Sequence, residues 1–308
     1  MERILTKIHQ QIADNLYHGA SLAIYQNGMW SEHFLGTQDG QAPVFSGLTY
    51  DLASVSKVVG VSTICTFLLN SGAIQLDDPL VKHYPDFHDA SVTLRQLLTH
   101  TTGIDPFIPN RDQLSEVELK EAINHITVTD NKDFLYTDIN FLLLGFMLEE
   151  IYGSSLKTIF SQEIFEPWQM VETGFGPVKE AVPTVKGIHD GVVHDPKAKV
   201  FGYHAGSAGL FSTVKDLEIF CRHYLEDDFA ENLWTNISLG NKPRSMGWNL
   251  DGDWIDHTGY TGPFVMVNRK TQTAVIFLTN RTFEYDDRPL WIAKRRKLRD
   301  VIKTSLTD

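Results

Sequence analysis

The chain has 308 residues, of which 42% are hydrophobic and 21% charged, the composition of an ordinary folded protein. This length allows one large domain or two closely packed subdomains around a substantial core. The 27 basic and 39 acidic side chains give a net charge of −12, so nucleic acid and anionic membranes are poor partners. Two cysteines, Cys65 and Cys221, do not indicate a disulfide framework.

The N-terminal 19 residues carry charges throughout and lack the apolar segment and cleavage site of a signal peptide. The longest apolar runs, near residues 58–69 and 141–148, are shorter than the roughly 20 residues that a bilayer requires. We therefore expect a cytoplasmic protein without a membrane span.

The first elements are a helix over about residues 1–15 and a β-hairpin. The helix is predicted because apolar residues recur on one stripe, at Ile4, Ile8, Ile12 and Leu16. Residues 21–25 and 29–34 predict two strands, since the Asn-Gly pair between them is a strong hairpin signal. An apolar helix is then expected from Ser54 to about Asn70, ending near Gly72.

Residues 77–226 are mostly helix and loop, and strands return near the C-terminus. Helices are expected at 94–98, from Ser115, at 140–152, at 155–165 with an end at Pro167, and from Thr213 to about Tyr224. Residues 262–267 and 273–279 predict a second hairpin, 247–255 a third strand, and 289–303 a basic helix.

This order predicts an α+β fold in one domain over 1–308. An antiparallel sheet of about five or more strands would be built from both termini and flanked by helices. Residues 1–75 and 230–308 would form the sheet part, and residues 76–229 a mainly helical part.

Ser54-Val-Ser-Lys57 at the start of the apolar helix is the first chemical motif. Residues three apart share a helix face, so Lys57 is expected to reach the Ser54 hydroxyl. A serine becomes a nucleophile when a base takes its proton, and a lysine serves if its pKa is lowered. Taken alone, this spacing is common and also fits a helix cap beside a solvated lysine.

Two further segments carry suitable groups. Tyr136-Thr-Asp138 precedes a helix, and a tyrosine near an ammonium is a usable base. His257-Thr258-Gly259-Tyr260 enters a predicted strand, where glycine lets the backbone approach a ligand and amides could bind an oxyanion. Alone, the first segment fits a packing tyrosine beside a capping Asp138 equally well, and the second is better explained as a glycine-rich turn.

Together the three motifs, in this order, resemble the superfamily of class C β-lactamases, penicillin-binding proteins and related (family VIII-type) esterases. Further segments share the resemblance, which covers nearly the whole chain: residues 50–57, 94–103, 136–145, 205–213, 246–248 and 278–281.

The resemblance implies that Ser54 attacks a carbonyl and forms an acyl-enzyme, which water then hydrolyses. Lys57 and Tyr136 would share the proton transfers as a coupled pair. The backbone N–H groups of Ser54 and Tyr260 would form the oxyanion hole, and Asp138, His257, Thr258 and Gly259 would contact the substrate. No metal or organic cofactor is expected.

Two positions depart from the β-lactamase pattern. Asp138 stands where asparagine is usual; it cannot donate to a substrate amide carbonyl, and it would raise the pKa of Lys57. His257 stands where lysine is usual and is mostly neutral at pH 7. Both changes favour a small ester or a less anionic amide over a β-lactam or a D-Ala-D-Ala peptide. Arg244 or Arg281 could restore a carboxylate site, so a penicillin-binding or carboxypeptidase-like activity stays open.

Two rival hypotheses remain. Residues 205–209 loosely fit the nucleophile elbow of an α/β-hydrolase around Ser207, although no strong strand precedes them. A non-catalytic sensor of the same fold is the other. No histidine cluster has metal-ligand spacing; His194-Asp195 suits turn hydrogen bonding, and His100 suits a packed helix end.

Overall fold

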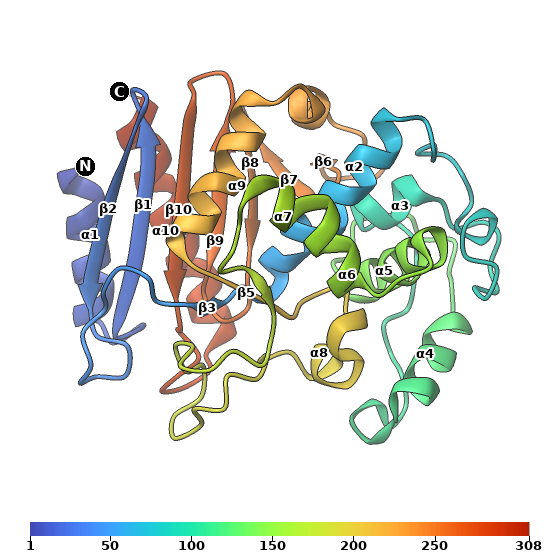
Figure 1. Cartoon of the computed structure of the whole chain (residues 1–308), viewed down its shortest axis with the longest axis horizontal. Coiled ribbons are helices and arrows are strands. Elements are labelled where there is room, and N and C mark those ends of the chain that lie inside the picture. Colours follow the sequence, from blue (N-terminus) through green and yellow to red (C-terminus); the bar gives the residue numbers. More distant parts are fainter. Residues whose placement is uncertain (308) are drawn as a thin grey trace.

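A seven-stranded antiparallel sheet runs through the computed structural model, which describes residues 1–307 (Figure 1). Its strand order is β2-β1-β10-β9-β8-β7-β6. The strands are β1 (Gly19–Gln26), β2 (Met29–Gly36), β6 (Arg244–Ser245), β7 (Trp248–Asp251), β8 (Trp254–Thr258), β9 (Phe264–Asn268) and β10 (Thr273–Thr279). Because β1 pairs with β10, both ends of the chain build this sheet, and the α+β prediction is confirmed.

Both the strands and the two-residue turn of the predicted N-terminal hairpin are confirmed. Gln26 pairs directly with Met29, so the turn contains only Asn27 and Gly28. Both turn residues have positive φ, 55° and 78°, which asparagine and glycine tolerate best. The local sequence therefore fixes the register of β1 against β2.

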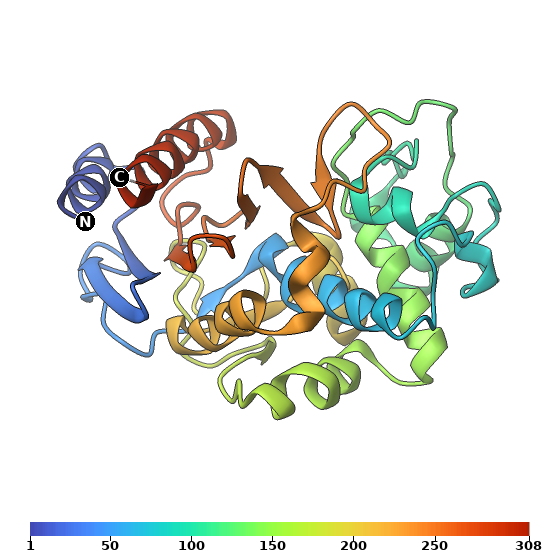
Figure 2. The same cartoon turned by 90° about the horizontal axis from the view of Figure 1, so that it is seen from above.

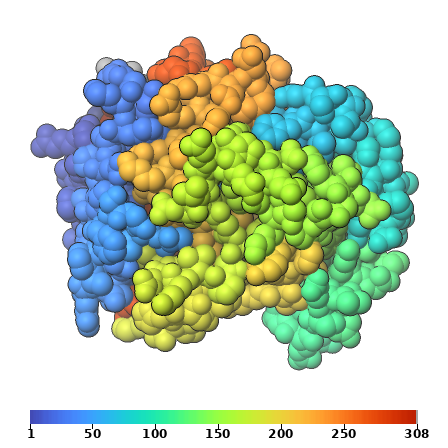
Figure 3. All heavy atoms as spheres, in the orientation of Figure 1, coloured from blue at the N-terminus to red at the C-terminus, as the bar shows by residue number. Residues whose placement is uncertain are grey.

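Helices cover both faces of the sheet (Figure 2). One face packs against α1 (Glu2–Ala13) and α10 (Arg288–Thr307), which lie side by side and bury residues such as Ile4, Ile8 and Leu298. The other face packs against α9 (Val214–Glu226), which contacts β1, β9 and β10. On the surface in Figure 3, residues from the middle of the chain (green to orange) lie between the blue N-terminal segment and the cyan residues near 75–100.

The predicted apolar helix crosses the core as three consecutive segments. A 3₁₀ turn (Ala53–Val55) leads into a π-helical stretch (Lys57–Ser62) and then into α2 (Thr63–Asn70). The 18 residues of this run are apolar enough to cross a bilayer, contrary to the prediction from run length, but 72% of them are buried inside the fold. Their composition is thus accounted for by packing in the protein core.

The remaining helices lie mostly in the middle of the chain. α5 (Ile139–Tyr152) is apolar on all sides and buried through its first ten residues, as expected of a central helix. The helix expected from Ser115 is α4 (Glu116–Asn124), and a capping box between Ser115 and Glu118 starts it. The others are α3 (Leu94–Thr99), α6 (Leu156–Phe160), α7 (Glu166–Trp168) and α8 (Pro196–Phe201).

Three local predictions were wrong or incomplete. Residues 247–255 form not one strand but the hairpin β7–β8, which turns at Gly252. Pro167 does not end its helix, because it lies in the first turn of α7, where a missing N–H costs nothing. A small second sheet, β3 (Tyr50–Asp51), β5 (Leu210–Ser212) and β4 (Gly174–Phe175), was not predicted. The proposed division into two subdomains stays a prediction.

We predict that Gly60→Ala lowers the free energy of unfolding. A Cβ at this position would lie 2.3 Å from the buried ring of Phe160. Overpacking of this kind typically costs about 1–3 kcal/mol, more than the helix propensity that alanine gains. Chemical denaturation measures the loss. Gly174→Ala, which meets no atom within 4 Å, is the control. A penalty that persists unchanged in a Phe160→Leu background would show that this ring is not the cause.

Candidate active site

Ser54 is held by a strained turn at the end of β3. The preceding residue, Ala53, has a φ of 45°, which is uncommon for a residue with a Cβ. The buried carboxylate of Asp51 stabilises this turn by accepting the Ala53 N–H at 2.8 Å and the His194 N–H at 2.7 Å. Burial raises the pKa of Asp51 to about 6. Local strain of this kind is typical of functional positions.

The Lys57 ammonium contacts the Ser54 hydroxyl, as the spacing predicts. Its Nζ lies 2.8 Å from Ser54 Oγ, 2.7 Å from Asp138 Oδ1 and 2.7 Å from the Ser207 carbonyl oxygen. The Lys57 side chain is completely buried. Its three donors are therefore matched by three acceptors from three separate segments of the chain.

Asp138 lies between two ammonium groups. Its Oδ2 is 3.0 Å from Lys197 Nζ, while its Oδ1 accepts from Lys57. Burial alone would raise the pKa of Asp138, but the charges of Lys57 and then Lys197 hold it well below its usual range. Burial alone would lower the pKa of Lys57, yet Asp138 keeps it above its ordinary value. Lys57 is thus an ammonium at neutral pH, as expected from the presence of an aspartate rather than an asparagine at position 138.

Tyr136 faces the same space from the segment before α5. Its ring centroid is 5.4 Å from Lys57 Nζ, and it packs on the His100 ring with centroids 4.5 Å apart. The Tyr136 hydroxyl is buried and, among the residues described, has no hydrogen-bond partner. His100 caps the C-terminal end of α3 in the left-handed conformation and contacts Asn140, so its predicted place at a helix end is confirmed.

The His257–Tyr260 segment lies on the far side of Ser54, at the end of β8. A Cβ at Gly259 would lie 2.7 Å from the Leu52 carbonyl oxygen, so only glycine permits this close approach to the Ser54 segment. Thr261 reinforces the contact by donating to the Asp51 carbonyl oxygen. Burial, followed by the charges of Arg244 and Lys57, lowers the pKa of His257 well below its usual value. The imidazole is therefore neutral.

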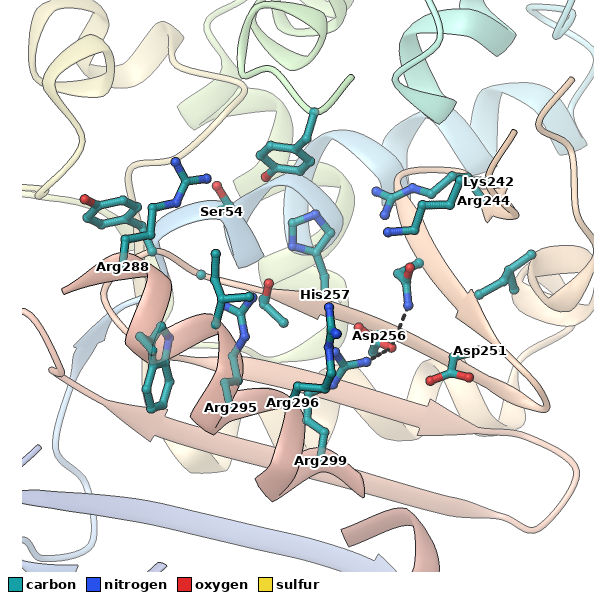
Figure 4. Close-up of a pocket in the computed structure, with 18 of the residues that line it drawn as sticks. Ser54, Lys242, Arg244, Asp251, Asp256, His257, Arg288, Arg295, Arg296 and Arg299 are labelled. Atoms are coloured by element: carbon teal, nitrogen blue, oxygen red, sulfur yellow. Dashed lines mark hydrogen bonds and ion pairs between the residues drawn. The ribbon is translucent and has the colours of Figure 1, made fainter. Parts of the chain in front are cut away.

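A cavity of about 610 Å³ connects these groups, which is within the usual range for small-molecule sites. Ser54, Tyr136 and residues 257–260 line it, while Asp138 and Lys57 lie behind its wall. Much of the remaining wall comes from α10 (Figure 4). The sequence predicted a basic helix there but gave no sign that it borders the site. Lys197 was also missed, since only tertiary packing brings it to Asp138.

The rival nucleophile Ser207 has the wrong surroundings. It lies in a loop after α8 and before β5, and the next helix begins only at Val214. Its side chain is fully buried. No nucleophile elbow of the α/β-hydrolase type is present, and the backbone carbonyl of Ser207 instead holds Lys57.

Other polar candidates have structural roles. Asp195 caps α8 by accepting the Ala198 N–H, and His194 Nδ1 lies 3.1 Å from Thr184 Oγ1, as expected of turn hydrogen bonding. Across residues 1–307 no group of three or more His, Cys, Asp or Glu side chains is arranged to hold a metal ion. Cys65 and Cys221 are both buried free thiols.

Comparison with known proteins identifies the family of the chain. Residues 6–299 match the family model described as Beta-lactamase. The chain belongs to the β-lactamase family. Members of this family are serine hydrolases, so this β-lactamase-family chain has the fold and the general chemistry that the motifs predicted.

Named relatives span several activities within the family. A protein of Escherichia coli K12 named "Putative D-alanyl-D-alanine carboxypeptidase" is 23% identical over 302 residues, covering 77% of this chain and 70% of its own. A class C β-lactamase from Rhodobacter sphaeroides superposes over 100% of both chains with a TM-score of 0.78 and 16% identity. EstCE1, a hydrolase with promiscuous acyltransferase activity, gives a TM-score of 0.74 at 16% identity, covering 96% of this chain and 97% of its own.

The charge of Asp138 provides a pH test of the role of Lys57. Asp138→Asn removes the charge that raises the pKa of Lys57 and leaves Lys197 nearby, so this pKa falls. If the ammonium form of Lys57 is the active one, a fluorophosphonate labels Ser54 more slowly once Lys57 loses its proton. In Asp138→Asn the labelling rate should therefore begin to fall at a lower pH than in the wild type. Labelling rates measured between pH 6 and 11 test this.

Asp195→Asn is the matched control, because Asp195 faces Lys197 at 3.5 Å and makes no contact with Lys57. Its charge also raises the pKa of Lys57, but less than that of Asp138 does, so this variant should move the profile in the same direction by much less. Faster labelling of Asp138→Asn at neutral pH would contradict the assignment and show that neutral Lys57 is the base. Thermal unfolding defines the usable range, since breaking a buried pair costs about 3–5 kcal/mol.

Proposed function

We propose that this protein hydrolyses a small ester or amide through an acyl-enzyme on Ser54. The supporting observation is the 2.8 Å contact between Ser54 Oγ and the buried Lys57 ammonium, at the wall of a cavity that also exposes Tyr136 and Tyr260. A hydroxyl paired with a cation in a small-molecule cavity is the arrangement that nucleophilic catalysis needs.

In the proposed acylation, Tyr136 acts in its phenolate form beside the Lys57 ammonium: Ser54 Oγ attacks the carbonyl carbon, and the Ser54 hydroxyl proton passes to the phenolate oxygen of Tyr136. Lys57 remains an ammonium and donates a hydrogen bond to Ser54 Oγ, which stabilises the charge that develops there. The backbone N–H groups of Ser54 and Tyr260 bind the carbonyl oxygen. The bond to the leaving group then breaks, the leaving group takes the proton from Tyr136, and water hydrolyses the acyl group.

Tyr136 is the better proton acceptor because its surroundings suit that role. Its hydroxyl is buried without a partner among residues 1–307, so no hydrogen bond must be broken before it accepts a proton. Lys57 and Arg244 are both near enough for their charges to attract negative charge on the Tyr136 oxygen. Lys57 itself is held protonated by Asp138 and cannot serve as the first acceptor.

We favour an esterase or peptidase over a β-lactamase. Asp138 is a carboxylate whose oxygens accept from Lys57 and Lys197, so it has no N–H to donate to a substrate amide carbonyl. The second candidate is a carboxypeptidase-like or penicillin-binding activity, in line with the name of the E. coli relative. The presence of Arg244 and Arg281 beside the site favours that candidate, because each could bind a carboxylate.

Intact-protein mass spectrometry tests the nucleophile. The wild type, incubated with a fluorophosphonate, a panel of small esters and penicillin, should gain an adduct on Ser54. Ser54→Ala should lose it, whereas Ser207→Ala, which keeps its backbone carbonyl, should retain it. A folded wild-type protein that takes no adduct would support the non-catalytic sensor, and an adduct on Ser207 would refute the proposed site. The lifetime of the adduct separates a hydrolase from a slow penicillin binder.

Tyr136→Phe should slow acylation by roughly 10²–10⁴-fold, the usual contribution of general acid–base catalysis. The ring and its packing on His100 are kept, so the melting temperature should hardly change. Stopped-flow labelling with a chromogenic ester gives the rate. A rate within threefold of the wild type would exclude Tyr136 as the proton acceptor.

A further inference from the structure

The cavity beside Ser54 is strongly basic although the protein is acidic overall. Seven cationic side chains line it, against three carboxylates, in a chain of net charge −12. Four of the cations lie on one face of α10: Arg288, Arg295, Arg296 and Arg299. Figure 4 shows these four projecting from the same helix toward the side of the cavity where His257 lies. Lys242, Arg244 and Arg281 complete the basic lining.

Five of these seven cations have no carboxylate partner among residues 1–307. Arg299 pairs with Asp256, and Arg281 with Asp286. In the described part of the chain no carboxylate lies within 4.0 Å of the other five, Lys242, Arg244, Arg288, Arg295 and Arg296. Two of the three cavity carboxylates are already occupied, because Asp251 contacts Lys303 and Asp256 contacts Arg299.

Several guanidinium groups also have unused donors. Nη2 of Arg281 and Nε of Arg244 and Arg299 are buried without an acceptor within residues 1–307. Burial lowers the pKa of Arg295 to about 10, and the neighbouring charges of Arg299 and Arg281 act in the same direction. Burial also lowers the pKa of Arg244 to about 10. Crowding like charges in a partly buried site is unfavourable unless an anion offsets it.

We propose that this cavity binds an oxyanion carrying two or more negative charges, and that the ester or amide hydrolysed at Ser54 carries such a group. Arginine suits this ligand because its planar fork donates two parallel hydrogen bonds to a carboxylate or a phosphate. The claim about the substrate rests on the proposed function, whereas the claim about binding does not.

The spacing of the arginines along α10 fits a substrate that carries such an anionic group. Arg288 and Arg299 lie three turns apart on α10, about 16 Å at 1.5 Å per residue. A substrate with its carbonyl at Ser54 therefore has room to extend an anionic group along the helix. The expectation of a less anionic substrate was based on two positions, Asp138 and His257, and did not include α10. The arginines of α10 supply far more positive charge than the missing lysine would.

The binding claim is tested by isothermal titration calorimetry of the Ser54→Ala variant. The dissociation constants of pyrophosphate and of tricarballylate are measured at constant ionic strength. This variant makes the measurement independent of any reaction at Ser54. Arg295→Gln and Arg296→Gln, introduced into it, should each weaken binding by about tenfold or more. Lys297→Gln is the matched control, since Lys297 is an exposed cation of the same helix outside the cavity; it should change the affinity by less than twofold.

Binding of either anion with this pattern supports the proposal, and a preference between them assigns the group as phosphate or as carboxylate. No binding of either at millimolar concentration would overturn it. Equal losses in Arg295→Gln, Arg296→Gln and Lys297→Gln would also overturn it, because they would reflect net charge alone.

The substrate claim is tested separately in the wild type. The ratio of kcat/KM for a mono-4-nitrophenyl ester of tricarballylate, which keeps two free carboxylates, to that for 4-nitrophenyl butyrate should fall in Arg295→Gln and stay constant in Lys297→Gln. An unchanged ratio in Arg295→Gln, with both esters still hydrolysed, would refute the substrate claim without touching the proposed function. A wild type that reacts with neither ester would count against the proposed function and leave the anion-binding result in place, so the two claims fail separately.

Discussion

The contact between Lys57 and Asp138 holds the functional site together. An ammonium with no exposed surface is unfavourable unless charges and hydrogen bonds compensate it, and here Asp138, the Ser207 carbonyl and the Ser54 hydroxyl do so. These partners come from the core helix, the start of α5 and the loop before β5. One buried charge therefore fixes the relative positions of three segments that are remote in sequence.

This contact, together with burial, sets the charge states of the groups around Ser54. Asp138 keeps Lys57 charged, and burial keeps His257 and His100 neutral. Tyr136 lines the same cavity as Ser54, and its hydroxyl has two cations near it and no hydrogen-bond partner among residues 1–307. Positive charge thus surrounds the reacting centre and continues along α10. A negative exterior with a positive interior cavity focuses the field on the site.

Local patterns predicted most of the fold and half of the site. The Asn27-Gly28 turn and the Ser115 capping box are short-range signals, and the β1–β2 hairpin and helix α4 formed as expected. The Asp251-Gly252 pair is a signal of the same kind and could have revealed the β7–β8 hairpin. The Ser54–Lys57 spacing encodes one helical turn. By contrast, Lys197 and the α10 arginines reach the site through tertiary packing, which no local pattern encodes.

The central pairing of β1 with β10 links the two ends of the chain. Thr279 donates to the carbonyl oxygen of Gly19 across 260 positions of sequence. During synthesis, β1 leaves the ribosome long before β10 exists, and its inner edge has no partner in the interval. The cavity wall formed by β8 and α10 arrives just as late. A nascent chain therefore cannot form the cavity until α10 has emerged. In the interval the edge of β1 that faces β10 is open to aggregation, because β2 covers only the opposite edge.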